Sequence, residues 1–163
     1  MAATGDETPL ELEVRVPPGQ ESVAEREIGA LGHEVELRGR GELRVRPAGP
    51  MRPLLQLERP LAIYAVRQLR GVGLEDADGP GAVTAAMELA AVVANLGFKG
   101  KLASYRVTIG PELVGDRRAI GRLAATIGRR LGVAQTVVGP ELILIVRQGR
   151  HGLELAARLP RLA

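Results

Sequence analysis

The chain has 163 residues, which is long enough for one domain or two small ones with a proper hydrophobic core. It contains no cysteine, which excludes disulfides, thiol nucleophiles and cysteine-based metal sites, and its two histidines, His33 and His151, stand far apart. No segment reaches the roughly 18 uninterrupted apolar residues of a membrane span, and the acidic start is unlike a signal peptide, so we expect a soluble cytoplasmic protein.

Charge is unevenly distributed along the chain. Residues 1–98 carry 10 basic and 15 acidic groups, a net charge of −5, whereas residues 99–163 carry 12 and 4, a net charge of +8. Only Lys99 and Lys101 among the 22 basic residues are lysines, so the positive charge is carried almost entirely by arginine. This distribution predicts an acidic first part and a second part that binds a polyanion.

Residues 1–70 predict a small domain of strands and helices. The expected order is a strand, a helix, a hairpin of two strands, a short helix and a strand, at residues 10–16, 22–31, 34–37 with 42–46, 51–57 and 61–69. This β-α-β-β-α-β order is typical of a ferredoxin-like sheet with helices on one face. The RGRG run at residues 38–41 could belong to a disordered RNA-binding tract, but a single copy between alternating strands favours a hairpin turn.

Residues 71–98 are expected to connect two domains. Residues 71–81 are rich in glycine and acids without periodicity, which is typical of a linker. The Gly71-Val72-Gly73 run is a poor dinucleotide-binding loop, because Asp76 stands where a third glycine is needed and no helix follows directly. Residues 82–96 predict a helix that is apolar on most sides and is therefore expected to be buried between layers, between the two halves of the chain.

Residues 99–163 predict a second domain in which strands accompany one amphipathic helix. We expect strands at residues 105–109, 135–138, 142–147 and 153–157. Asp116 is a suitable N-cap for the helix, because its carboxylate can accept a hydrogen bond from an unpaired amide of the first turn. The residues that recur at helical spacing and form the inward face are Ile120, Leu123, Ala124, Ile127 and Leu131.

The outward face of this helix carries a row of arginines. At about 100° per residue, Arg118, Arg122 and Arg129 fall together, with Arg117 and Arg130 to either side. Helix stability alone disfavours this choice, because a like-charge pair four residues apart and cations near a helix N-terminus are both unfavourable. Helix amides and guanidinium groups at one end suit a phosphate ligand, whereas an ordinary solvated helix face is the alternative.

No catalytic constellation is recognisable in the sequence. There is no Ser/His/Asp arrangement, no pair of carboxylates in a predicted pocket, no metal-ligand spacing and no glycine loop suited to S-adenosylmethionine. We therefore expect no catalytic residue, no metal and no cofactor in this chain, and no methyltransferase activity from it alone.

Several motifs in the second half resemble a known RNA-binding module. Tyr105-Arg106-Val107-Thr108 matches an aromatic-Arg-Val strand, and residues 116–121 followed by Gly128 match the opening and the small residue of a helix. Residues 137–145 match a strand preceded by Pro-Asp, with Glu141 in place of the usual Asp. This half of the chain resembles the THUMP domain of tRNA-modifying enzymes. It departs from the family at residues 109–112, which read IGPE where basic residues are usual.

The first half resembles the ferredoxin-like companion domain of the same enzymes. Pro18-Gly19-Gln20-Glu21, residues 25–28 and Leu31-Gly32 match its opening, which is most familiar from THUMP-containing RNA guanine-N2 methyltransferases. The resemblance implies an α+β protein with an N-terminal ferredoxin-like sheet and a C-terminal THUMP-type α/β domain. The implied domains are residues 1–70, a linker and connecting helix at residues 71–98, and an RNA-binding domain at residues 99–163.

The resemblance also implies a function and a partner. In that family a catalytic domain, which uses S-adenosylmethionine, follows the THUMP domain, so the chain is expected to be the part that binds the acceptor end of tRNA for base modification, or a stand-alone relative. With so few aromatic residues, contact with RNA is expected to rest on phosphates. The basic residues expected to make those contacts are Lys99, Lys101, Arg106, Arg117, Arg118, Arg122, Arg129, Arg130 and Arg147. The alternative is a structural or regulatory interaction module without RNA binding.

Overall fold

The computed structural model describes residues 10–113 and 115–162, which form two compact units. The first unit contains residues 10–66 together with residues 158–162, and the second contains residues 67–157. From the sequence we expect boundaries at residues 70 and 99, whereas the structural boundary falls inside one strand, β4 (Ala62–Arg70). The long apolar helix belongs to the second unit, and the last described residues belong to the first.

The first unit is an antiparallel sheet with the ferredoxin-like order of elements. Its strands and helices are β1 (Glu11–Arg15), α1 (Glu21–Ala30), β2 (Glu34–Gly39), β3 (Glu42–Arg46), α2 (Arg52–Leu55) and the start of β4. The strands lie in the order β2-β3-β1-β4. The β-α-β-β-α-β order and the sheet predicted from the sequence are therefore confirmed.

The alternation of the strands explains the two faces of this sheet. Leu12 and Val14 pair with Val45 and Leu43 across β1 and β3, and all four side chains are buried on the face covered by α1. The opposite face carries charges, of which Glu13 is almost completely buried. Its carboxylate lies 2.8 Å from Nε of Arg15 and 3.1 Å from Nη2 of Arg44, which supplies the partners that a buried charge needs.

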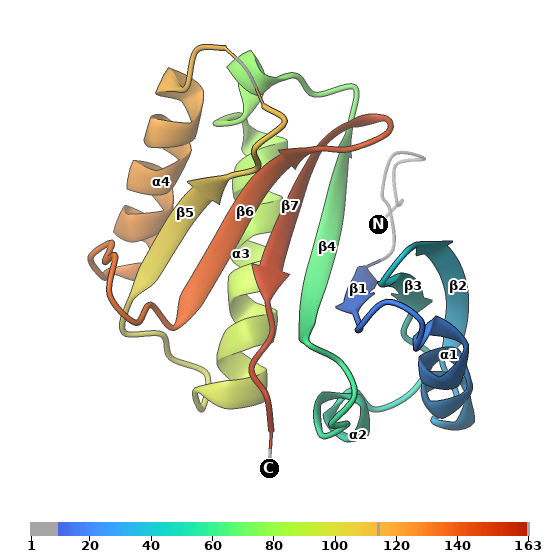
Figure 1. Cartoon of the computed structure of the whole chain (residues 1–163). Coiled ribbons are helices and arrows are strands. Elements are labelled where there is room, and N and C mark those ends of the chain that lie inside the picture. Colours follow the sequence, from blue (N-terminus) through green and yellow to red (C-terminus); the bar gives the residue numbers. More distant parts are fainter. Residues whose placement is uncertain (1–9, 114, 163) are drawn as a thin grey trace, which may run out of the picture. The chain divides into compact units, whose positions relative to one another are not determined.

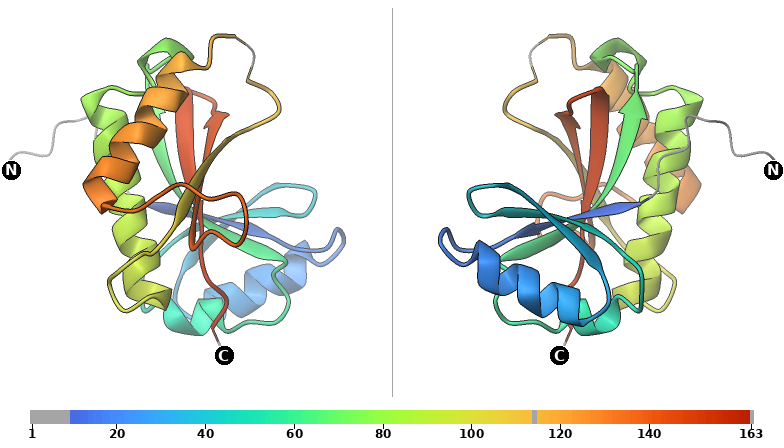
Figure 2. Two further views of the ribbon diagram at one scale, coloured as in Figure 1. Left: turned by 90° about the vertical axis from the view of Figure 1, so that its left-hand side faces the viewer. Right: turned by 90° about the vertical axis from the view of Figure 1, so that its right-hand side faces the viewer.

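The second unit has two helices on one face of its strands. After the end of β4 come η1 (Leu74–Asp76), α3 (Pro80–Gly97), β5 (Tyr105–Ile109), α4 (Arg118–Leu131), β6 (Leu142–Gln148) and β7 (Gly152–Arg158). β5 runs parallel to β6, and β6 runs antiparallel to β7. Figures 1 and 2 show α3 and α4 side by side on the same face of these strands, where α3 contacts β6 and α4 contacts β5.

α3 is the apolar helix expected at residues 82–96. Its 18 residues have a mean hydropathy of 1.3, so by length and composition it could cross a membrane. In this structure it acts as a core helix: its buried side chains, which include Val83, Leu89 and Val93, lie on the side that contacts α4 and β6. Its small residues allow this close packing, because alanine at many of the buried positions lets neighbouring backbones approach.

The prediction of a strand at residues 135–138 is wrong. Only Gln135 forms a bridge with β5, opposite Tyr105, and the chain then leaves the sheet. The side-chain oxygen of Gln135 accepts the backbone N–H of Val107 at 3.3 Å, so a side chain occupies the place of the next ladder bond. Gly139, with a φ of 61°, and Pro140 then turn the chain towards β6.

The contact between β5 and α4 depends on a glycine. The hydroxyl of the buried Tyr105 donates a hydrogen bond to the carbonyl of Ala124 at 2.7 Å, and the ring lies directly against Gly128. A Cβ at Gly128 would meet the hydroxyl and the Cζ of Tyr105, the latter at 3.2 Å. The small residue at this position is therefore required by packing.

Two glycines of α4 offer a matched test of this contact. Gly128→Ala should lower the free energy of unfolding by about 1–3 kcal/mol, because the overpacked Tyr105 cannot move without losing its hydrogen bond. Gly121→Ala meets nothing within 4 Å and should instead stabilise the protein by roughly 0.5–1 kcal/mol through helix propensity. Chemical denaturation of both variants measures the difference, and equal stabilisation by both would contradict the role of Gly128.

Candidate nucleic-acid interface

α4 displays the arginine row predicted from the sequence. It buries Ala119, Ile120, Leu123, Ile127 and Gly128 against the rest of the second unit, so Arg118, Arg122 and Arg129 lie on the outward face and all three are exposed. Asp116 is not the N-cap expected from the sequence, because Arg117 holds that position; Oδ1 of Asp116, one residue earlier, accepts a hydrogen bond from the backbone N–H of Arg118 at 2.9 Å. The helix itself begins at Arg118, after Arg117.

The nine predicted RNA contacts lie at two opposite ends of the second unit. β5 and β6 begin at the end where α3 and α4 finish, which is the lower end of this unit in Figure 1. Five of the predicted contacts lie there, and we call this group the basic end: Lys99, Lys101, Arg106, Arg129 and Arg130. The other four lie at the opposite end, near the start of α4 and the end of β6, and they are Arg117, Arg118, Arg122 and Arg147.

Carboxylates partner three of the four arginines at the opposite end. Nε of Arg122 lies 2.7 Å from Oδ2 of Asp78, in the segment between η1 and α3, and Nε of Arg118 lies 3.1 Å from Oδ2 of Asp116. The hydrogen bond from Arg122 holds the pKa of Asp78 below its usual value, and Asp78 raises the pKa of Arg122 in turn. A phosphate would have to compete with these carboxylates.

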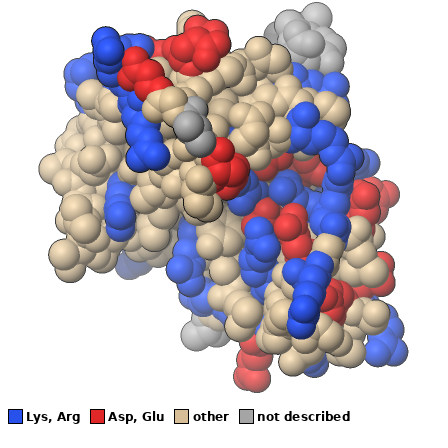
Figure 3. All heavy atoms as spheres, turned by 45° about the horizontal axis from the view of Figure 1, so that its top comes forward, with Lys and Arg blue, Asp and Glu red and all other residues tan. Residues whose placement is uncertain are grey.

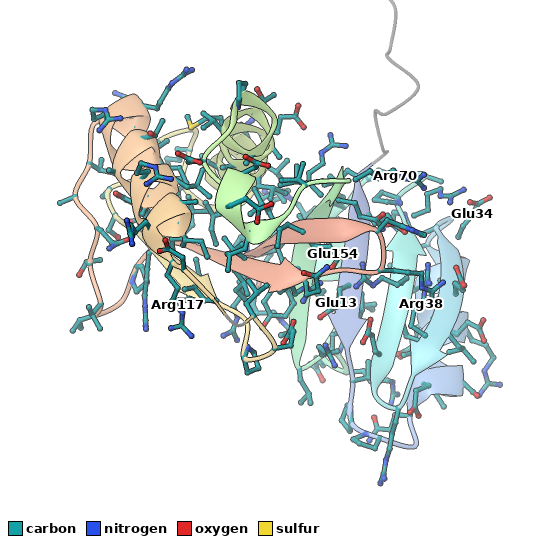
Figure 4. The ribbon with its side chains drawn as sticks, turned by 90° about the horizontal axis from the view of Figure 1, so that it is seen from above. Glu13, Glu34, Arg38, Arg70, Arg117 and Glu154 are labelled. Carbon is teal, nitrogen blue, oxygen red and sulfur yellow. The ribbon has the colours of Figure 1, made fainter. Side chains whose placement is uncertain are left out.

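Arg147 differs most from its predicted role as an exposed phosphate contact. Its side chain is only 14% exposed, and its Nε lies 3.1 Å from Oε1 of Glu154, its partner across β6 and β7. Figure 3 looks onto this end of the unit and shows acidic side chains directly beside basic ones. Figure 4, viewed from above, shows Arg117 at the start of α4 and Glu154 on β7.

The cations of the basic end have a different environment. All five side chains are exposed, and within the described part of the chain none of them pairs with a carboxylate. Glu141 is also at this end, but its Oε1 accepts the backbone N–H of Ala103 at 2.7 Å. Arg106 lies on the sheet face away from α4, because it follows Tyr105, whose ring packs against α4, and successive side chains of a strand point to opposite faces. These side chains therefore present positive charge without a carboxylate partner, although Nη2 of Arg129 donates a hydrogen bond to Oγ1 of Thr126 at 3.1 Å.

Two further features of the described residues concern metal ligands and a surface hollow. Among the described residues, no group of three or more His, Cys, Asp or Glu side chains could hold a metal ion. The first unit has a shallow hollow of about 210 Å³ on the charged face of its sheet. Acids and arginines alternate around this hollow, which gives it no single sign of charge; its lining residues are Glu11, Glu34, Val35, Glu36, Arg44 and Arg46.

Sequence reasoning missed two features of this region. Asp78 looks like one acid of a solvated linker, and its role as the partner of Arg122 depends on contact between η1 and α4. Val137 and Val138 look like part of a strand, whereas they are exposed in the loop between α4 and β6. The Gly139-Pro140 break was the available signal, because it leaves little length for a strand before β6.

Comparisons with solved structures identify the fold. No protein-family model matches the chain, and no curated protein matches its sequence. TrmN from Thermus thermophilus matches with a TM-score of 0.63 and 22% identity, and a 4-thiouridine synthetase in complex with RNA and ATP matches with 0.62 and 14%. PH1313 from Pyrococcus horikoshii matches with 0.55 and 12%. The chain has a THUMP-like α+β fold.

These matches cover most of the chain but only part of each relative. They include 92% of this chain and 45% of TrmN, 94% of this chain and 42% of the synthetase, and 93% of this chain and 55% of PH1313. The chain therefore spans about half the length of the solved structures it resembles. At these identities the likeness establishes the fold and not the activity.

The ion pair between Asp78 and Arg122 can be tested by titration. Because Arg122 is the main cause of the lowered pKa of Asp78, Arg122→Gln should raise that pKa towards its ordinary value of 3.8. A carboxyl with a lowered folded pKa contributes stability above its unfolded pKa and loses it as the pH falls through the folded pKa. The small stability that Asp78 contributes should thus be lost on acidification below about pH 4 in the native protein, and it should be absent from Arg122→Gln.

NMR titration of the side-chain carboxyl carbon of Asp78 measures this effect. Arg118→Gln provides the control, because Arg118 lies on the same helix face but pairs with Asp116 instead. An unchanged pKa of Asp78 in Arg122→Gln would show that the ion pair does not persist in solution.

Proposed function

We propose that this chain is an RNA-binding module that holds RNA, with tRNA as the expected substrate, for base modification. The observation that carries the proposal is the basic end, where five exposed cations gather without carboxylate partners in the described part of the chain. The fold supports it, because one of the solved proteins with the same fold is a 4-thiouridine synthetase in complex with RNA.

Contact with phosphates suits the composition of this end. Arginine and lysine bind the RNA backbone by charge, and each neutralised phosphate releases counterions. Base stacking on aromatic side chains is a minor option, because the chain has two Tyr, one Phe and no Trp, and Tyr105 is buried. Such a surface reads the shape and position of the backbone rather than a base sequence.

The catalytic step belongs to another domain or subunit in this proposal. The fold is shared with TrmN and with a predicted N6-adenine-specific DNA methylase from Listeria monocytogenes, of which the chain covers 45% and 39%. We propose a methyltransferase domain as the partner, with S-adenosylmethionine bound there and not by this chain. The acceptor end of tRNA is then the region that this module holds, so that a target base lies at a fixed reach from the catalytic site.

The alternative function is a structural or regulatory module that does not bind RNA. The ion pairs of Arg118 and Arg122 favour this alternative for the opposite end, because paired and exposed charges are typical of a solvated surface. Such ion pairs are not found at the basic end in the described part of the chain. RNA binding therefore explains the unpaired cations, and a solvated surface explains the paired ones.

Two double variants separate these roles. Arg129→Gln/Arg130→Gln removes two cations of the basic end and should lower the salt slope of tRNA binding by roughly two units, or about one unit per lost phosphate contact. Arg118→Gln/Arg122→Gln should have a clearly smaller effect, because Asp116 and Asp78 already partner those arginines. Fluorescence anisotropy with tRNA over a range of salt concentrations gives both slopes.

Stability serves as the control for these variants. Arg129 and Arg130 lie in the last turn of α4, where positive charge is favourable, so their loss should cost only a few tenths of a kcal/mol. Affinity should fall similarly for unrelated RNA sequences of the same shape. If Arg129→Gln/Arg130→Gln leaves both the slope and the affinity unchanged, the basic end does not bind RNA and the alternative function is favoured.

A further inference from the structure

Two adjacent valines at the basic end are almost fully exposed to solvent. Val137 is 74% exposed and Val138 is 87% exposed, and both lie in the loop between α4 and β6. The loop lies at the same end as the C-termini of α3 and α4 in Figure 1. Exposed valines are not unusual when they are isolated, but here two stand side by side among cations.

Hydrogen bonds on both sides hold this loop against the neighbouring chain. The backbone N–H of Thr136 donates to the carbonyl of Tyr105 at 2.9 Å, and the backbone N–H of Ala103 donates to Oε1 of Glu141 at 2.7 Å. Within the loop, the backbone N–H of Val138 donates to Oγ1 of Thr136 at 3.3 Å. The loop is therefore anchored on both sides of the two exposed valines, which reduces the ordering that a ligand must impose.

The surrounding charge indicates what the valines contact. The loop follows the last turn of α4, which carries Arg129 and Arg130, and its hydrogen bonds to Ala103 and Tyr105 join it to the segment that carries Lys99 and Lys101. The partner must then combine an apolar surface with negative charge. RNA does so wherever a nucleotide is unpaired, because the faces of paired bases are stacked inside the helix while an unpaired base and its ribose are open to contact.

We propose that Val137 and Val138 pack against an unpaired nucleotide of the bound RNA while the flanking cations hold its phosphates. This inference rests on the proposed RNA binding and adds a contact that charge alone does not provide. The valines would then favour RNA that has a single-stranded segment next to a duplex. They would not select a base sequence, since a valine side chain contacts any base or ribose by dispersion.

The test compares two RNA hairpins with the full chain. One hairpin is blunt, and the other has the same stem with a short single-stranded extension. The unaltered protein should bind the extended hairpin about tenfold more tightly, which is within the range expected when two exposed valine side chains are removed from water. Val137→Ser/Val138→Ser should bind both hairpins with the affinity of the blunt one, and its salt slope should be unchanged because no phosphate contact is lost.

The matched control is Leu61→Ser, which removes an exposed apolar side chain that is 61% exposed in the first unit and should alter neither affinity. Both variants should keep the thermal unfolding temperature, since the altered side chains are exposed.

Three results would overturn the inference. Equal affinity of the unaltered protein for both hairpins, or an undiminished preference in Val137→Ser/Val138→Ser, would overturn it while leaving RNA binding intact. Loss of a self-association in sedimentation velocity, without a change in RNA affinity, would show that the valines meet a second copy of the chain. Absence of binding to either hairpin by the unaltered protein would overturn the proposed function and this inference together.

Discussion

The packing of α4 against β5 sets the surface of the second unit. Tyr105 lies between the strand and the helix, with its ring against Gly128 and its hydroxyl bonded to the carbonyl of Ala124. This contact fixes the rotation of α4 about its own axis, because the tyrosine fits only where the helix has no Cβ. The same rotation directs Arg118, Arg122 and Arg129 away from the strands. The direction of the arginine row thus depends on this buried contact together with the apolar face of α4.

Charge neutralisation then divides the arginines into two classes. At the opposite end, Asp78, Asp116 and Glu154 lie within 3.1 Å of guanidinium nitrogens, and each pair offsets its own charge. At the basic end the strands begin and the helices finish, and the described chain places only Glu141 beside five cations. The helix dipole differs between the two ends: Arg129 and Arg130 occupy the last turn of α4, where positive charge is favourable, whereas Arg117 at the N-cap and Arg118 in the first turn lie where it is unfavourable.

In the proposed function, the chain would bind and position RNA, and the chemistry would belong to another domain. The exposed cations would then provide affinity for an RNA backbone, and the proposed contact of Val137 and Val138 would add a preference for the shape of the RNA. The THUMP-like fold holds both on rigid elements, since β5, β6 and α4 carry the loops that present them. A catalytic domain attached to such a unit would need to recognise only the base, because the rest of the RNA would already be held at a fixed distance.

Much of the fold and part of the site could be predicted from local patterns. The alternation of residues 10–16 and the helical period of residues 118–131 determine which side chains are buried, since each pattern depends on one element alone. The order of elements in the first unit and the outward arginine row follow from the same rule. The motifs that contain Tyr105 and Gly128 also indicated a THUMP-type strand and helix from the sequence alone.

Only the tertiary structure decided which cations remain unpaired and where the valines lie. Arg122 and Asp78 are separated by 44 residues, so no local pattern could reveal their 2.7 Å contact. Arg147 is mostly buried because it pairs with Glu154 on the next strand. Val137 and Val138 are not in a strand, because the side chain of Gln135 takes the next hydrogen bond along β5. Ion pairing and exposure depend on distances between elements that are remote in sequence, and folding alone sets those distances.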